Sequence, residues 1–150
     1  ILNMKTYVGE VGKFQTVQDA ANAMWQISKS FGPHTSEEWL ALSQNMVRRL
    51  EDGTYCLHYD PQLRVPIRAV TEEQAKAGEA TLWQVYDLIQ CPTLLIRGAE
   101  SELLSAAAAL EMAQRGARAQ VVTLPGVGHA PTLTHQDQID IVRQFLGLPA

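Results

Sequence analysis

The sequence predicts an α/β fold in which a mainly helical first part precedes a strand, a helix, a strand and a final helix. Two short apolar runs, Thr93–Arg97 and Gln120–Leu124, have the length and the β-branched content of buried strands. An alanine-rich helical segment separates them, and strands joined through a helix pair in parallel. Upstream of residue 90, apolar side chains recur mostly at helical spacing.

The composition excludes several classes of partner and cofactor. The chain has 150 residues, 46% of them hydrophobic, with 12 basic and 16 acidic side chains and a net charge of −4. It has no basic stripe, so neither nucleic acid nor an anionic membrane is expected as a partner. Cys56 and Cys91 stand far apart and outside any Cys-x-x-Cys motif, which indicates reduced thiols in a cytoplasmic protein and no zinc site. We expect no metal and no cofactor.

The opening residues are not expected to form a signal peptide. The opening residues lack the basic start and apolar core of a signal peptide, and no run approaches the ~20 apolar residues of a membrane span. The chain begins Ile-Leu-Asn without a methionine, so we expect its true start to have been removed. Residues 1–13 are expected to form a weakly structured lead-in.

Two helices are predicted in the next stretch. The first starts at Thr16, whose partner in a short capping box is Asp19, and stops at Gly32. The second starts near Thr35 and is expected to continue as far as the turn Glu51-Asp52-Gly53. Its predicted buried positions are Trp39, Leu42, Met46 and Leu50.

The middle of the chain is more irregular. Residues 54–59 alternate as a short strand or an extended lid segment would, and residues 60–70 are expected to be loop because Pro61 and Pro66 interrupt them. Two short helices are predicted next, one capped by Thr71 and ending at Gly78, the other covering 80–89.

The last third has clear helix boundaries. Ser105 is predicted to cap the alanine-rich helix, which ends at Gly116 in a left-handed C-cap. Thr134 and Asp137 are expected to start the final helix. Its predicted buried face consists of Ile139, Val142, Phe145 and Leu146.

Candidate functional residues follow both predicted strands. Glu100 and Glu102 come after the first strand, and His129 follows Gly126 and Gly128 after the second. The carboxyl ends of parallel strands meet at one edge of a sheet, where α/β proteins place their sites. A carboxylate and an imidazole are therefore expected at the same edge. Of the remaining polar side chains, His34 and His58 are expected to be structural or solvated, His135 to lie in the first turn of the final helix, and Ser101 to be a turn or helix-entry residue.

The stretch from Cys91 to Leu133 resembles the C-terminal end of an α/β-hydrolase. The resemblance rests on the strand P-T-L-L-I-R-G, the acidic loop E-S-E and the segment P-G-V-G-H-A-P. In that family the last two strands deliver the acid and the histidine of a catalytic triad. The resemblance implies that His129 is the general base and Glu102 the acid. Glu102 stands where the family usually has Asp, and Glu100, two residues away, is an alternative acid.

The nucleophile of such a triad is missing from the chain. No serine lies in a G-x-S-x-G motif, and no H-G-G-G-like run is present to form an oxyanion hole. The resemblance then implies a partial α/β-hydrolase fold: a helical cap over residues 1–82 and the C-terminal part of the core over residues 83–150. The nucleophile, a serine or the aspartate of dehalogenase-like members, is expected upstream.

The resemblance also implies partners. We expect a small, fairly apolar ester-like substrate, because Trp25 and Trp39 of the cap and Trp83 at its boundary offer an apolar wall. Two parallel strands leave an unpaired edge, so we expect either the N-terminal half of the hydrolase, as a separate or missing chain, or self-association to cover it. The alternative to a hydrolase is a non-catalytic interaction module that kept the scaffold.

Overall fold

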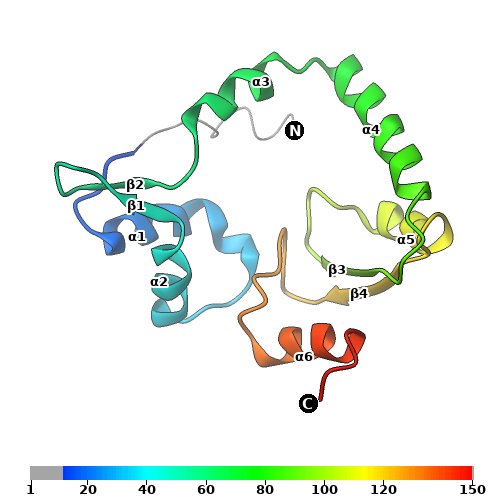
Figure 1. Cartoon of the computed structure of the whole chain (residues 1–150). Coiled ribbons are helices and arrows are strands. Elements are labelled where there is room, and N and C mark those ends of the chain that lie inside the picture. Colours follow the sequence, from blue (N-terminus) through cyan, green and yellow to red (C-terminus); the bar gives the residue numbers. More distant parts are fainter. Residues whose placement is uncertain (1–11, 150) are drawn as a thin grey trace. The chain divides into compact units, whose positions relative to one another are not determined.

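The computed structural model describes residues 12–149, so most of the predicted lead-in over residues 1–13 lies outside the described residues. The chain divides into two compact units (Figure 1). Among the described residues, the first unit comprises residues 12–26 and 36–84, and the second comprises residues 27–35 and 85–149. The second unit thus takes a short segment from early in the sequence, which no local pattern indicates.

The first unit contains helices α1 (Val17–Ser28, whose last two residues belong to the second unit) and α2 (Ser36–Gln44). The predicted capping box is present, because the Asp19 carboxylate accepts from the Thr16 amide at 3.1 Å and the Thr16 hydroxyl accepts from the Asp19 amide at 3.1 Å. Trp39 of α2 is buried, and its indole nitrogen donates to the Ala21 carbonyl of α1 at 2.8 Å. This bond satisfies the one polar atom of a large apolar side chain.

The second predicted helix is wrong beyond Gln44. There the chain turns and forms strand β1 (Val47–Arg49), which pairs antiparallel with β2 (Tyr55–Leu57). The connecting turn contains Gly53 at φ 82° and the Asp52 carboxylate, which accepts from the Thr54 amide at 3.0 Å. The reason lies outside the local pattern: the residues that pair with β1 lie six to ten positions later in the chain, and a helical periodicity of apolar residues does not reveal them.

Residues 60–70, predicted as loop, are largely helical. A 3₁₀ turn, η3 (Pro61–Leu63), leads directly into α3 (Arg64–Ala69). Pro66 is tolerated because it lies in the first turn of α3, where backbone amides have no partner within the helix. The prolines that predict a break thus lie at the start of helical segments.

Helix α4 (Glu72–Asp87) replaces the two short helices that were predicted. Thr71 caps it as expected, since the Thr71 hydroxyl accepts from the Gln74 amide at 3.1 Å and the Gln74 side chain accepts from the Thr71 amide at 2.9 Å. Gly78 lies in its interior without breaking it. A single glycine costs a helix only about 1 kcal/mol relative to alanine, which the cap and neighbouring turns offset.

The second unit holds a parallel strand pair, β3 (Leu94–Gly98) and β4 (Gln120–Leu124), joined by helix α5 (Ala106–Gln114). Both strands lie where the sequence predicts them, within one residue. Ser105 caps α5 by accepting from the Ala108 amide at 3.1 Å. Gly116 follows the helix at φ 53°, the left-handed conformation that was expected.

The last helix, α6 (Gln136–Phe145), starts later than predicted. His135 is its N-cap residue and makes no side-chain capping bond, so the expected Thr134–Asp137 start is wrong. The Thr134 hydroxyl instead lies 3.0 Å from that of Thr132. Of the predicted buried face, Leu146 is 60% exposed, while Gln138 is buried and accepts from the Leu133 amide at 3.0 Å.

The end of α4 is fixed to the end of α5 within the second unit. The Tyr86 hydroxyl donates to the Met112 carbonyl at 2.7 Å, and Arg115 binds Asp87 through two nitrogens at 2.8 and 2.5 Å. The Arg115 guanidinium lowers the pKa of the Asp87 carboxyl below its ordinary value. None of the helices described in residues 12–149 has both the length and the apolar character needed to cross a membrane.

Candidate active site

The loops that follow β3 and β4 are joined by backbone hydrogen bonds. The Ala99 amide donates to the Leu124 carbonyl at 2.8 Å, and the Glu100 amide donates to the Val127 carbonyl at 2.9 Å. These bonds continue the parallel ladder beyond the strands themselves. The acidic loop and the histidine loop therefore meet at the carboxyl edge of the pair, as the sequence predicts.

Glycines make this meeting possible. A Cβ atom on Gly98 would lie 2.7 Å from the Val127 carbonyl carbon and closer still to two carbonyl oxygens, those of Val127 and Gly128. Gly128 is packed in turn against Ser30, whose carbonyl accepts from the Gly128 amide at 2.5 Å. Three backbone segments approach here at distances that no side chain permits.

His129 follows this packed backbone and is exposed. Its Nδ1 atom lies 3.4 Å from the hydroxyl oxygen of Ser101, a long hydrogen-bond distance. The same hydroxyl accepts from the Leu104 amide at 3.0 Å, so Ser101 is the turn residue that the sequence indicates. The sequence does not reveal that Ser101 contacts His129, because the two residues lie 28 positions apart in the chain.

Glu102 lies in the same loop and is exposed. Within residues 12–149 its carboxylate makes no hydrogen bond or ion pair, and the same holds for the carboxylate of Glu100. The structure thus brings the acidic loop to His129 through Ser101. The pairing of Glu102 with His129 stays a prediction.

A buried arginine holds the acidic loop from the strand side. Arg97 of β3 is only 8% exposed, and its guanidinium donates to the Leu104 carbonyl at 2.7 Å and to the Ala99 carbonyl at 3.1 Å. Hydrogen bonds from a charged donor are stronger than those between neutral groups. Arg97 therefore fixes both ends of the loop that carries Ser101 and Glu102.

His34 has a structural role, as expected. Its Nδ1 atom lies 3.0 Å from the Gly32 carbonyl oxygen, its Nε2 atom lies 2.8 Å from the Thr132 hydroxyl, and its ring centroid lies 5.4 Å from that of His135. These contacts attach residues 32–34 to the segment after His129. The described residues contain no group of three or more side chains arranged to hold a metal ion. Cys56 and Cys91 are both free thiols.

The chain is similar in sequence to a known hydrolase. The chain is 42% identical over 142 residues to a 3-hydroxybutyrate-oligomer hydrolase of Cupriavidus necator; the match covers 93% of this chain and 48% of that protein. No protein-family model matches the sequence.

Solved structures give the same result. An α/β hydrolase from Novosphingobium aromaticivorans matches with a TM-score of 0.78 and 28% identity, covering 97% of this chain and 50% of that one. A putative hydrolase from Rickettsia typhi also matches with a TM-score of 0.78, at 21% identity, covering 99% of this chain and 48% of that one. The chain thus spans about half the length of these relatives. It has a partial α/β-hydrolase fold, as the resemblance implies, and its matches to about half of these proteins are consistent with a C-terminal half.

Proposed function

We propose that this chain supplies the catalytic histidine and the acid of a serine-type hydrolase that cleaves small, fairly apolar esters. His129 is the general base and Glu102 is the acid. The observation that carries the proposal is the backbone junction of the two loops, in which the Glu100 amide donates to the Val127 carbonyl at 2.9 Å. This junction holds the histidine beside the loop that contains the acid.

The chemistry assigns a role to each ring nitrogen of His129. Nε2 accepts the proton of the nucleophile's hydroxyl as that oxygen attacks the ester carbonyl, and later returns it to the leaving alcohol. Nδ1 faces the acidic loop, since Ser101 lies 3.4 Å from it. A carboxylate on that side keeps the proton on Nδ1 and stabilises the imidazolium. Glu102 reaches one methylene further than an aspartate, so it can approach from its exposed position in the loop.

The nucleophile, in this proposal, belongs to a segment outside the present chain. The chain has no G-x-S-x-G motif, and its relatives are about twice as long. Residues 1–82 serve as the cap, and residues 83–150 as the last part of the core. The strands β3 and β4 form a two-stranded sheet in the described residues, and we propose that strands of the N-terminal half extend it.

The substrate class follows from the relative in Cupriavidus necator. That protein is named for hydrolysis of 3-hydroxybutyrate oligomers, which are short linear esters of a hydroxy acid. We propose the same class of bond for this protein: an ester between small hydroxy acids, with an apolar chain and a terminal carboxylate.

The test uses the native protein together with any polypeptide that completes it. Intact masses under denaturing conditions, before and after a fluorophosphonate probe, show whether a nucleophile-bearing segment is present and which polypeptide gains the probe. We expect labelling outside residues 1–150. Labelling within them would overturn the statement that this chain lacks the nucleophile.

Activity is then measured on the completed protein with 3-hydroxybutyrate dimer. His129→Gln is expected to lower kcat on the order of 10³-fold or more. Glu102→Gln is expected to lower kcat by a smaller factor that is still large. Both variants should still bind the substrate. Glu100→Gln is the matched control, because it removes an acid of the same loop. A larger loss with Glu100→Gln would move the acid to that residue. A completed protein that neither takes the probe nor hydrolyses esters would favour a non-catalytic interaction module.

A further inference from the structure

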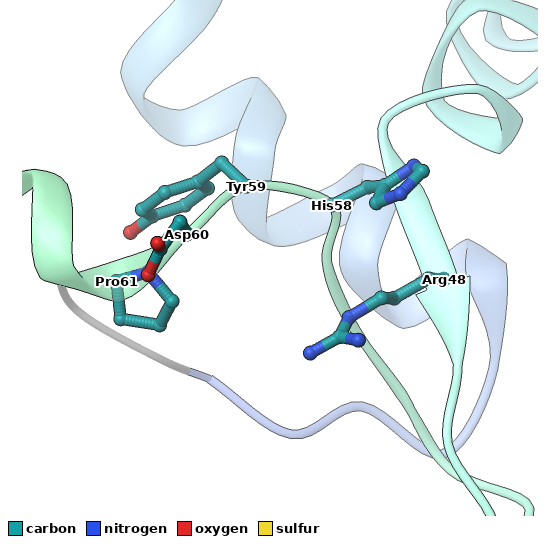
Figure 2. Close-up of a pocket in the computed structure, with 5 residues that line it drawn as sticks. All are labelled: Arg48, His58, Tyr59, Asp60 and Pro61. Carbon is teal, nitrogen blue, oxygen red and sulfur yellow. The ribbon is translucent and has the colours of Figure 1, made fainter.

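The first unit contains a pocket lined by charged and aromatic side chains, none of which belongs to the strand edge just described. Its volume is about 450 Å³. The described residues that line it are Arg48, His58, Tyr59, Asp60 and Pro61 (Figure 2). This volume lies within the range of small-molecule sites. All five residues belong to the first unit, so the described part of the pocket lies within that unit.

Strand pairing determines which side chains share this pocket. Arg48 of β1 lies opposite Cys56 of β2. The ladder continues one step further, since the His58 amide donates to the Met46 carbonyl at 2.8 Å. Side chains alternate between the two faces of a strand, so Arg48 and His58 stand on the same face as diagonal neighbours. The hairpin thus presents a guanidinium and an imidazole together.

The other wall is fixed by a helix cap. The Asp60 carboxylate accepts from the Gln62 amide at 2.8 Å, and Pro61 begins the 3₁₀ turn η3. Both features restrict the backbone of this wall, because proline fixes φ and the cap fixes the carboxylate. In Figure 2 the Arg48 side chain extends toward the side of the pocket formed by Asp60 and Pro61.

The charges of the pocket are not neutralised by each other. Within the described residues, the Arg48 guanidinium makes no hydrogen bond or ion pair, although the Asp60 carboxylate lines the same pocket. One oxygen of that carboxylate accepts from the Gln62 amide, and the other accepts no hydrogen bond from residues 12–149. The pocket therefore offers a cation for an anionic ligand and, separately, an acceptor for a ligand hydroxyl.

We propose that this pocket binds a small hydroxycarboxylate. The ligand's carboxylate binds the Arg48 guanidinium, with His58 beside it, and the ligand's hydroxyl donates to Asp60. A bidentate guanidinium–carboxylate contact is among the stronger polar interactions in proteins. A phosphate dianion fits less well, because it brings a second negative charge toward Asp60. The proposal concerns binding only and stands whether or not the catalytic assignment is correct.

The experiment is a titration of the full ¹⁵N-labelled chain with sodium 3-hydroxybutyrate, followed by NMR and calorimetry. We expect the side-chain signals of Arg48 and His58 to shift. Methyl 3-hydroxybutyrate lacks the free carboxylate. It is expected to bind at least about tenfold more weakly, which is the effect of losing one charged hydrogen-bonded contact. Butyrate lacks the hydroxyl and is expected to bind more weakly than the hydroxy acid.

Variants identify the residues. Arg48→Gln is expected to weaken 3-hydroxybutyrate binding about tenfold. Arg49→Gln is the matched control: Arg49 is the next residue of β1, points to the opposite face and does not line the pocket. If Arg48→Gln does not fold, Arg48→Lys keeps the charge but loses the fork geometry and should still weaken binding. Equal effects of Arg48→Gln and Arg49→Gln would overturn the proposal, as would inorganic phosphate binding as tightly as the hydroxy acid.

Discussion

Gly98 and Gly128 are in direct backbone contact, so close that a Cβ on Gly98 would overlap the Gly128 carbonyl oxygen. Gly98 ends β3 and Gly128 precedes His129, so this contact joins the strand edge to the histidine loop. The position of His129 therefore depends on a residue 31 positions away that has no side chain.

Gly98→Ala is expected to destabilise the protein strongly. The added methyl group meets backbone atoms of Val127 and Gly128, which cannot move without breaking the loop junction. We expect a loss of about 3 kcal/mol in the free energy of unfolding, at the upper end for overpacking. The matched control is Gly78→Ala in α4, where the new methyl group meets nothing within 4 Å; it should stabilise by up to about 1 kcal/mol. Urea denaturation measures both. Similar effects for the two variants would contradict the contact at Gly98.

Removal of the Arg97 guanidinium is expected to release the acidic loop. Arg97→Leu deletes the donors to the Leu104 and Ala99 carbonyls while keeping an apolar side chain in the buried position. We expect a cost of about 1–3 kcal/mol for the unsatisfied carbonyls. Hydrogen exchange should speed up in residues 99–104 more than in β4. Arg64→Leu, on exposed helix α3, is the control and should leave that exchange unchanged.

Ser101→Ala tests the contact with His129 directly. The variant removes an oxygen 3.4 Å from His129 Nδ1 and the acceptor for the Leu104 amide. We expect the ¹⁵N signal of Nδ1 to move and the Leu104 amide to exchange faster. Ser105→Ala is the matched control: it removes the cap of α5 at a cost of about 1 kcal/mol. If both variants moved the Nδ1 signal equally, the change could not be assigned to the hydroxyl of Ser101.

The stability of the first unit should fall in acid through Asp52. Hydrogen bonds from Lys13 at 2.8 Å and from Thr54 hold the pKa of this carboxyl below its ordinary value of 3.8. Because the folded pKa is the lower one, the folded state gains stability above pH ~4 and loses it as pH falls toward the folded pKa. The stability difference between wild type and Asp52→Asn should therefore be constant near neutral pH and shrink below pH ~4.

Salt gives a second readout of the same pair. Lys13 and Asp52 are both exposed, with side-chain exposures of 63% and 48%. High salt should therefore reduce the stability difference between wild type and Asp52→Asn. Asp137→Asn is the control, since Asp137 makes no hydrogen bond or ion pair within the described residues. Thermal melts between pH 2 and 7 measure all three proteins. A difference for Asp52→Asn that does not change with pH would show that its carboxylate is not stabilised in the folded state.

The sequence by itself determined the parts of this protein whose causes are local. Strands β3 and β4 follow from short runs of β-branched residues, and the caps at Thr16, Thr71 and Ser105 follow from a hydroxyl at the first turn of a helix. The resemblance to α/β-hydrolases rests on the same region, in which glycines and a histidine follow the second strand.

Tertiary structure decided whatever depends on partners distant along the chain. Residues 47–49 are a strand and not a helix because β2 supplies their hydrogen bonds, and a periodicity of apolar residues does not contain that information. The contact of Ser101 with His129, the burial of Arg97 and the packing of Ser30 on Gly128 each join segments that only the folded chain brings together. The chemical groups of the candidate site can be identified from the sequence. Their positions depend on the close approach of the backbones at Gly98 and Gly128.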